Sequence, residues 1–285
     1  MRIDAHQHFW KFNPLRDTWI TDEMTGLRRD FMPEDLAPEL AANQMEATIA
    51  VQADQSEQET RFLLDLAEMH PQIAGVVGWV NLTAPNIRER LRHFSQFPKL
   101  RGFRHIVQGE PDDRFLLRED FLRGIACLRE FDFIYEILIY PKQLPAAVEF
   151  VQKFPQQPFV VDHMAKPLVK QREIASWSRQ MRALAAAPNV CCKVSGLITE
   201  GDWKNWRPED FHPYLDLVFE VFGRDRLLFG SDWPVCLLAG SYRRVKGLVE
   251  DYVRGWLQSE KDDLFGGNAE RFYGVKSVRT KAQKQ

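Results

Sequence analysis

The chain has 285 residues, of which 45% are hydrophobic and 27% charged, a composition that excludes a disordered protein. Lysine and arginine number 38 against 40 aspartates and glutamates, and this near balance of charge argues against a nucleic-acid-binding protein. No apolar run approaches the roughly 18 residues of a membrane span, and the start, MRIDAHQHFW, is unlike a signal peptide, so we expect a cytoplasmic protein.

Eight short apolar or β-branched segments recur along the chain, and each is followed by a stretch with helical spacing. In chain order these segments cover residues 2–6, 47–51, 75–80, 100–107, 133–139, 159–163, 190–194 and 226–232. Near-continuous apolar runs are typical of strands that are buried on both faces, as in a parallel sheet.

The helical stretches have recognisable limits. Prolines such as Pro145 fall near predicted helix starts, and the pair 222–223 (Phe-Gly) predicts a helix stop before the last strand. Eight strand–helix alternations predict a single α/β domain over residues 1–275, a (β/α)₈ TIM-like barrel, followed by a polar, disordered tail at 276–285. The alternative is a doubly wound open sheet, but the sequence has neither the Gly-x-Gly-x-x-Gly turn nor a phosphate loop.

The first strand-to-helix connection is unusually long, from about residue 9 to residue 33. Long loops in compact domains are usually functional, and on a barrel this one would lie over the carboxyl ends of the strands. The connection contains Trp10, Arg16, Trp19, Arg28 and Arg29.

Ionisable side chains follow several predicted strands at their carboxyl ends, where barrel enzymes build their active sites. The first strand ends in His6 and His8, which should point the same way because strand side chains alternate. The fourth, sixth and eighth strands end near Arg104, His105, Asp162, His163, Lys166 and Asp232. Distant segments would thus bring imidazoles, carboxylates and cations to one region.

Such a group of residues suits metal-assisted or acid–base hydrolysis. Two imidazoles at positions i and i+2 of a strand can hold one zinc ion, and a nearby carboxylate can take a proton from an attacking water. Without a metal, the same histidines could polarise a carbonyl as hydrogen-bond donors.

Each of these residues also has a structural interpretation. His163 could be a buried core histidine, and Asp162 and Asp232 could accept hydrogen bonds from backbone N–H groups. Arg104 and Lys166 could be paired charges at the rim. Structural or surface roles are expected for His70, His93 and His212, and buried thiols for Cys127, Cys191, Cys192 and Cys236.

Six stretches, taken together, match one family of enzymes. They are IDAHQHFW at 3–10, LRGFRHIVQ at 100–108, FVVDHMAKP at 159–167, CKVSGL at 192–197, FGRDRLLFGSDWPVC at 222–236 and GGNAERFY at 266–273. The chain resembles the amidohydrolase superfamily, and within it the branch that hydrolyses sugar lactones. The resemblance extends over nearly the whole chain.

This resemblance implies a TIM-like barrel whose catalytic positions fall on His6, His8, His163 and Asp232. In such enzymes the aspartate activates a water molecule, and the histidines, with or without a divalent ion, polarise the lactone carbonyl. The implied reaction opens an L-fuconolactone-like sugar-acid lactone to the free aldonate.

Further residues are expected to bind the substrate. Cations and a histidine would contact hydroxyl groups or the ring oxygen, while tryptophans would offer flat faces to the apolar side of the sugar. These residues are Trp10, Arg104, His105, Lys166, Trp203 and Trp233. Trp203 could equally belong to the core.

The chain departs from the two-metal members of the superfamily, which carry a lysine or glutamate at the end of strand four and histidines after strands five and six. Here strand four offers Arg104 and His105, strand five ends at Tyr140 without a histidine, and only His163 follows strand six. A two-metal site is therefore not expected. Two alternatives stay open: a metal-independent site, and one divalent ion, zinc first, held by His6, His8, His163 and Asp232.

Other functions stay open as well. The same scaffold could serve a metal-dependent decarboxylase or another carboxylic-ester hydrolase, since fold alone does not choose between them. A binding protein without activity is a third hypothesis, against which the retained histidines and aspartate speak. The sequence decides neither the stereochemistry of the sugar nor whether the chain forms a homodimer.

Overall fold

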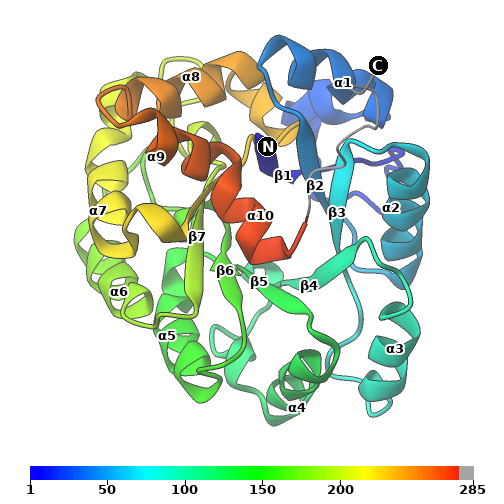
Figure 1. Ribbon diagram of the computed structural model, residues 1–285. Helices are drawn as coiled ribbons and strands as arrows, with labels where there is room; N and C mark the ends of the chain where they lie inside the picture. The colour runs from blue at the N-terminus through cyan, green and yellow to red at the C-terminus, as the bar shows by residue number, and fades with distance from the viewer. Residues whose placement is uncertain (276–285) are drawn as a thin grey trace.

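The structure is a computed structural model that describes residues 1–275, so the tail predicted at 276–285 lies outside the described residues. Eight parallel strands pair with one another in chain order (Figure 1). The strands are β1 (Ile3–Gln7), β2 (Ala47–Val51), β3 (Ile73–Gly78), β4 (Leu100–Ile106), β5 (Ile134–Leu138), β6 (Phe159–Val161), β7 (Val190–Val194) and β8 (Leu227–Phe229). This order confirms the predicted (β/α)₈ barrel.

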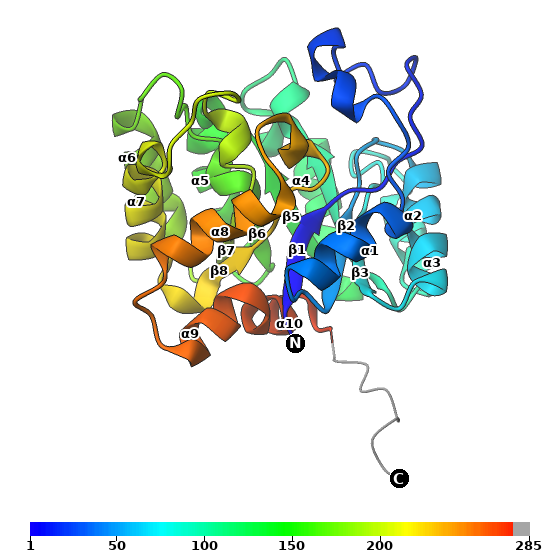
Figure 2. The same cartoon turned by 90° about the horizontal axis from the view of Figure 1, so that it is seen from above.

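Helices surround the strands as an outer ring, and α10 lies across the barrel end that carries the N-terminus (Figures 1 and 2). The helices are α1 (Pro33–Ala42), α2 (Glu57–Met69), α3 (Ile87–Phe94), α4 (Glu119–Leu128), α5 (Leu144–Lys153), α6 (Ala175–Ala185), α7 (His212–Phe222), α8 (Tyr242–Tyr252), α9 (Gln258–Asp262) and α10 (Asn268–Tyr273). Within residues 1–275, none of them is both long enough and apolar enough to cross a membrane.

Five strands, β3 to β6 and β8, end earlier than the sequence predicts, and β6 and β8 show why. β6 ends at Val161 and β8 at Phe229, because residues that follow leave the extended conformation: φ is positive at 163–166 and at Asp232. The limits of β2 and β7 are as predicted. The predicted helix stop is confirmed at Gly223, whose φ of 67° terminates α7.

Apolar side chains pack on both sides of the sheet. Phe103 and Phe159 belong to the larger cluster, which fills the layer between strands and helices. Val160 and Leu228 belong to a second cluster inside the barrel, which Tyr273 of α10 closes at the N-terminal end of the strands. Burial on both faces explains why the strand sequences are almost continuously apolar.

The barrel closes through individual hydrogen bonds between β1 and the segment after β8. The backbone N–H of Asp232 donates to the carbonyl of His6 at 2.8 Å, and that of His8 donates to the carbonyl of Trp233 at 2.8 Å. These bonds join the segment with the two N-terminal histidines directly to the segment with Asp232.

Asp4 supports this closure from one layer deeper. Its buried carboxylate accepts hydrogen bonds from the Ser231 N–H at 2.9 Å, the Ser231 hydroxyl at 2.5 Å and the Tyr242 hydroxyl at 2.9 Å. Burial raises the pKa of Asp4 to about 6, although these hydrogen bonds act in the opposite direction. Asp4 therefore ties β1 both to the end of β8 and to α8.

We predict that Asp4→Ala lowers the free energy of unfolding by about 3 kcal/mol or more, because buried donors on Ser231 and Tyr242 lose their acceptor. The control is Tyr242→Phe, which removes a single hydrogen bond and should lower that free energy by about 1 kcal/mol. Urea unfolding followed by circular dichroism measures both changes. Equal losses in the two variants would contradict the role given to Asp4.

Candidate active site

His6 of β1 and His8, which follows it, both reach the interior, although Asp4 of the same strand faces outward, because the strand is irregular. The pairing register between β1 and β2 shifts between Asp4 and Gln7, and such irregularities re-aim side chains. Asp4 contacts α8 outside the barrel, whereas His6 reaches the interior. His6 Nε2 lies there 3.2 Å from His8 Nε2.

His163 is held in a turn of left-handed residues that follows β6. Its φ is 53°, and φ stays positive through Lys166. Gly196 lies against the ring: its φ is 62°, and a Cβ atom there would lie 2.5 Å from His163 Nδ1. Ser195 Oγ lies 2.9 Å from the same nitrogen, and this contact holds the orientation of the ring.

Asp232 brings a carboxylate to these three imidazoles. Its Oδ1 atom lies 3.4 Å from His8 Nε2 and 3.9 Å from the Nε2 atoms of His6 and His163. All four side chains are buried, with no residue more than 5% exposed. The structure therefore brings together the four residues that the sequence predicts to be catalytic.

Burial decides the protonation of this cluster. It lowers the pKa of His6 well below its ordinary value, with Lys193 adding to the effect, and it lowers the pKa of His163 despite the nearby Asp232. Burial would raise the pKa of Asp232, but His163 and His8 together hold it below its ordinary value. At neutral pH the cluster therefore combines neutral imidazoles at His6 and His163 with an ionised carboxylate, which suits both metal binding and base catalysis.

The donor atoms fit a single metal ion. Ligands about 2.1 Å from a tetrahedral zinc ion lie about 3.4 Å from one another. His6, His8 and Asp232 can each place one ligand atom within 4.8 Å of the others. His6, Asp162 and His163 form a second such group, but Asp162 is already paired with cations.

A layer of buried charge lies beneath the cluster, inside the barrel. Lys193 Nζ lies 2.6 Å from Glu136 Oε1 and 3.2 Å from Asp162 Oδ1, and Arg104 NH1 lies 3.0 Å from Asp162 Oδ2. The Tyr273 hydroxyl donates to Glu136 at 2.5 Å. Burial and Asp162 raise the pKa of Glu136 to about 7 against the effect of Lys193. We call Arg104, Glu136, Asp162 and Lys193 the ionic layer.

Two of the predicted substrate-binding cations lie near the cluster. Arg104 is 3% exposed and belongs to the ionic layer, with NH1 3.3 Å from His6 Nε2. Lys166 is only partly buried, and its Nζ lies 4.0 Å from Glu200 Oε1 and 5.5 Å from the centre of the Tyr140 ring. Of the two, only Lys166 is placed to meet a substrate at the mouth.

His105 does not join the cluster. It points outward from β4, where its ring stacks on Phe115 with centroids 4.7 Å apart, and its two nitrogens contact Trp79 and Glu110. Side chains alternate along a strand, so Arg104 and its neighbour His105 cannot both face the interior. The structure therefore corrects the expectation that His105 binds the substrate.

The predicted tryptophan faces are mostly covered. Trp10 is 1% exposed, donates to the Arg29 carbonyl and packs edge-on against Phe31. Trp233 is 3% exposed and packs against the same phenylalanine. Neither ring offers a free face to a sugar, which corrects these two expectations. Trp203 is partly buried and donates to the Thr199 carbonyl, so of the three rings only that of Trp203 is not fully buried.

Sequence reasoning missed several residues of the site. Lys193 and Glu136 lie in apolar strand segments. Because a buried charge is normally paired with an opposite charge, their positions could have predicted that they pair with each other. Gln52, whose amide donates to the Arg104 carbonyl at 3.0 Å, gave no comparable signal. Glu200 was also missed, because nothing in the sequence places it beside Lys166.

The long first connection lies at the barrel end opposite to α10 (Figure 2), as predicted. Beside it is a pocket of about 210 Å³, lined by Lys11, Arg16, Asp54, Ser56, Gln58, Glu59 and Phe62. Glu59 is 5% exposed and accepts a hydrogen bond from the Ala53 N–H at 3.1 Å. Burial raises its pKa to about 7 despite the lowering effect of Arg16.

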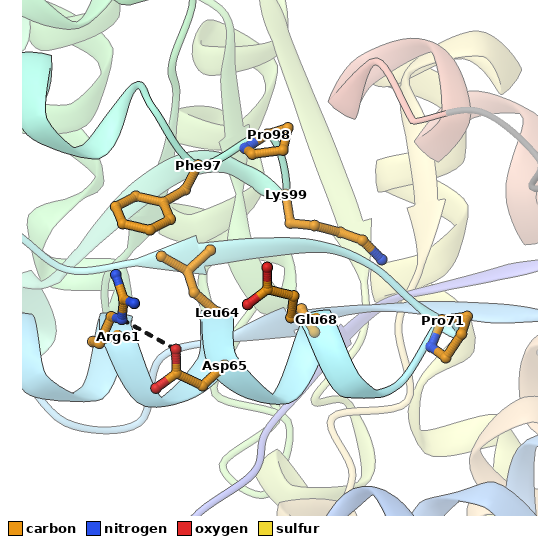
Figure 3. Close-up of a pocket in the computed structure, with 9 residues that line it drawn as sticks. Arg61, Leu64, Asp65, Glu68, Pro71, Phe97, Pro98 and Lys99 are labelled. Atoms are coloured by element: carbon orange, nitrogen blue, oxygen red, sulfur yellow. Dashed lines mark ion pairs between the residues drawn. The ribbon is translucent and has the colours of Figure 1, made fainter.

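A larger groove of about 360 Å³ lies on the outside of the barrel, between α2 and the segment that precedes β4 (Figure 3). Leu64, Phe97 and Pro98 line it, and an ion pair between Arg61 and Asp65 lies at its edge. The groove belongs to the helix layer and not to the strand ends, so it lies away from the candidate active site.

Comparison with known proteins identifies the family. A family model described as amidohydrolase matches residues 3–275, which include the whole cluster. The chain belongs to the amidohydrolase family. This membership confirms the resemblance drawn from the six sequence stretches.

Named relatives within the amidohydrolase family cover nearly the full chain. L-fucono-1,5-lactonase of Burkholderia multivorans is 43% identical over 286 residues, and the match covers 96% of each chain. L-fucono-1,5-lactonase of Burkholderia ambifaria is 36% identical over 280 residues, again 96% of each chain. A crystal structure of an amidohydrolase from B. multivorans with bound zinc has a TM-score of 0.93 and 43% identity, and covers 97% of this chain and 100% of that chain.

We predict that Glu59→Gln changes the pH dependence of stability. A glutamate whose pKa is higher in the folded than in the unfolded state favours folding below pH 4.5, and this contribution is lost as the pH rises through about 7. Between pH 4 and pH 8 the free energy of unfolding of the variant should therefore rise, relative to that of the wild type, by up to about 3 kcal/mol. Urea unfolding at several pH values measures the difference.

The matched control for this prediction is Glu68→Gln, on the exposed side of α2. This variant makes the same substitution at an exposed position of the same helix. If the stability of Glu59→Gln relative to the wild type did not change with pH, the raised pKa of Glu59 would be contradicted.

Proposed function

We propose that this chain is a lactonase that opens a sugar-acid lactone to the free aldonate, with an L-fuconolactone-like compound as the substrate. The observation that carries the proposal is the cluster itself, an ionised Asp232 within 3.9 Å of three imidazole nitrogens. The 43% identity with an L-fucono-1,5-lactonase over nearly the whole chain supports the choice of substrate class.

Asp232 acts as the general base. It takes a proton from a water molecule, whose oxygen forms a bond to the lactone carbonyl carbon. In the tetrahedral intermediate the former carbonyl oxygen carries the negative charge. The intermediate collapses by breaking the bond between that carbon and the ring oxygen, and the proton held by Asp232 passes to the ring oxygen, which leaves as a hydroxyl group.

The imidazoles polarise the carbonyl. A donor aimed at the oxyanion is worth about 3 kcal/mol in the low-dielectric interior of an enzyme, and His6 and His163 direct Nε2 toward Asp232. His6, His8 and Asp232 are also the residues that would hold a zinc ion, which supplies Lewis-acid polarisation of the same carbonyl when it is bound.

Residues at the ends of three neighbouring strands recognise the hydroxyl groups. Lys166 follows β6, Glu200 follows β7 and Tyr140 follows β5, and the first two lie close enough to share one polar substituent. Burial and Asp232 raise the pKa of Glu200 against the lowering effect of Lys166, and its carboxyl offers oxygen acceptors to substrate hydroxyl groups. Trp203 walls the same side of the mouth.

We predict that Asp232→Asn lowers kcat by about 10³-fold, because the amide cannot accept the proton of water. The exposed Asp225→Asn, just before β8, serves as control and should keep wild-type activity. Lactone hydrolysis followed with a pH indicator measures both, and circular dichroism verifies the fold. A folded Asp232→Asn enzyme with full activity would refute the role of this carboxylate.

A second prediction concerns substrate choice. In a panel of 1,4- and 1,5-lactones, 6-deoxy L-sugar lactones should be hydrolysed fastest, and δ-valerolactone, which lacks hydroxyl groups, at least tenfold more slowly in kcat/KM. Repeating the assay with chelator separates catalysis by the imidazoles alone from catalysis that needs zinc added back. Folded protein that hydrolyses no lactone but releases carbon dioxide from an aromatic acid would replace the lactonase by a decarboxylase.

A further inference from the structure

Lys193 lies directly behind His6, and the catalytic steps above make no use of it. The residue is completely buried, and its Nζ lies 3.0 Å from His6 Nδ1. Histidines that bind metals usually have a carboxylate or a carbonyl behind them, which accepts the hydrogen of the second ring nitrogen. An ammonium group has no acceptor to offer, so the contact constrains where His6 carries its proton.

The proton of His8 is fixed first. His8 Nδ1 lies 2.8 Å from the Val51 carbonyl oxygen, which can only accept a hydrogen bond. A neutral His8 therefore carries its hydrogen on Nδ1. Its Nε2 atom is left with a lone pair that points at the centre of the cluster.

His6 must be compatible with this lone pair. The two Nε2 atoms lie 3.2 Å apart, so without a cation between them one must donate to the other. A neutral His8 cannot donate through Nε2, and the Lys193 ammonium group 3.0 Å from His6 Nδ1 can only donate, so both contacts place the hydrogen of His6 on Nε2. His6 Nδ1 is then an acceptor, which is what the Lys193 ammonium group requires.

We propose that Lys193 is a positioning residue that holds the proton of His6 on Nε2. The metal-free site then offers an N–H group that can donate to a substrate, and zinc can bind His6 Nε2 only if that proton is lost. The hydrogen bonds run in one direction, from Lys193 to His6, from His6 to His8 and from His8 to the Val51 carbonyl. The Nε2–H group of His6 is thus present in the cluster, and its hydrogen bond can shift from His8 to an oxyanion of the substrate.

The site also has partners for the other neutral form of His6, which carries its hydrogen on Nδ1, but the hydrogen-bond distances for that form are longer. With its hydrogen on Nδ1, His6 would donate to Asp162 Oδ1 at 3.4 Å and accept from Arg104 NH1 at 3.3 Å. The lone pairs of His6 and His8 would then face each other, which is unfavourable unless a cation lies between them. Arg104 does not need His6 as an acceptor, because the same NH1 atom lies 3.0 Å from Asp162.

Zinc binding would reverse which ring nitrogen of His6 carries the hydrogen. To bind through Nε2, His6 loses the proton there and gains one on Nδ1, with no net change in protonation. The new Nδ1–H faces the Lys193 ammonium group, which must turn fully toward Glu136 and Asp162. Lys193 therefore lowers the affinity for zinc. The catalytic meaning of this inference rests on the proposed function, but the position of the proton does not.

The position of the proton is measured directly by NMR of the metal-free protein with ¹⁵N-labelled histidine. Two-bond ¹H–¹⁵N correlations distinguish the two neutral forms, and the loss of one set of signals in His6→Gln assigns His6. The expected result is hydrogen on Nε2 for His6 and on Nδ1 for His8, which serves as the internal reference. Hydrogen on Nδ1 of both residues would overturn the proposal.

Zinc affinity is measured by competition with a chromophoric chelator, with zinc chloride as the probe. The variant Lys193→Met combined with Glu136→Gln removes one charge of each sign, and it should bind zinc about tenfold or more tightly than the wild type. The matched control, Glu136→Gln alone, keeps the ammonium group behind His6 and should not gain affinity. Equal or weaker zinc binding by the double variant would overturn the proposal.

These readouts separate two possible failures. If the protein hydrolyses no lactone, the NMR and zinc measurements still test the role of Lys193. If it hydrolyses lactones but His6 carries its hydrogen on Nδ1, the lactonase stands and the role of Lys193 falls. Because the NMR experiment uses the wild-type chain, it remains decisive even if the double variant does not fold.

Discussion

Charge neutrality inside the barrel is the constraint on which the rest of the structure depends. Arg104 and Lys193 face Asp162 and Glu136 at hydrogen-bonding distances, and all four side chains are almost completely buried. A buried ion pair adds little net stability, because both partners lose their hydration, but removing one partner costs about 3–5 kcal/mol. The main effect of the ionic layer is therefore to restrict the positions of the side chains above it, and not to raise the free energy of unfolding.

The active site takes its geometry from this layer and from the closure of the barrel. His6 stands between Lys193, Asp162 and Arg104, and the backbone around it is bonded to Asp232, which Asp4 holds in place one layer deeper through Ser231. The imidazoles and the carboxylate thus meet in a dry environment in which their charges are strongly coupled. The proposed roles of a base and of polarising groups depend on this shared environment and not only on the individual residues.

Much of this architecture could be predicted from local sequence. Apolar strands buried on both faces, helix limits at proline and glycine, and the placement of His6, His8, His163 and Asp232 at strand ends all follow from periodicity and topology. The ends of β6 and β8 were predicted too late, because the left-handed residues from His163 onward and at Asp232 have no strong sequence signal. His105, Trp10 and Trp233 were misplaced because a position in the chain does not tell which side of a strand or loop a side chain covers.

The sequence by itself determined the barrel, the family and the four residues of the cluster, since each follows from local residue patterns and from their order along the chain. Only the tertiary structure decided how these residues work. The irregularity in β1 turns His6 inward, and Lys193, 187 positions away in the chain, comes within 3.0 Å of its ring. The charge and proton of a buried histidine depend on partners brought together by barrel closure, and no local pattern in the chain records that proximity.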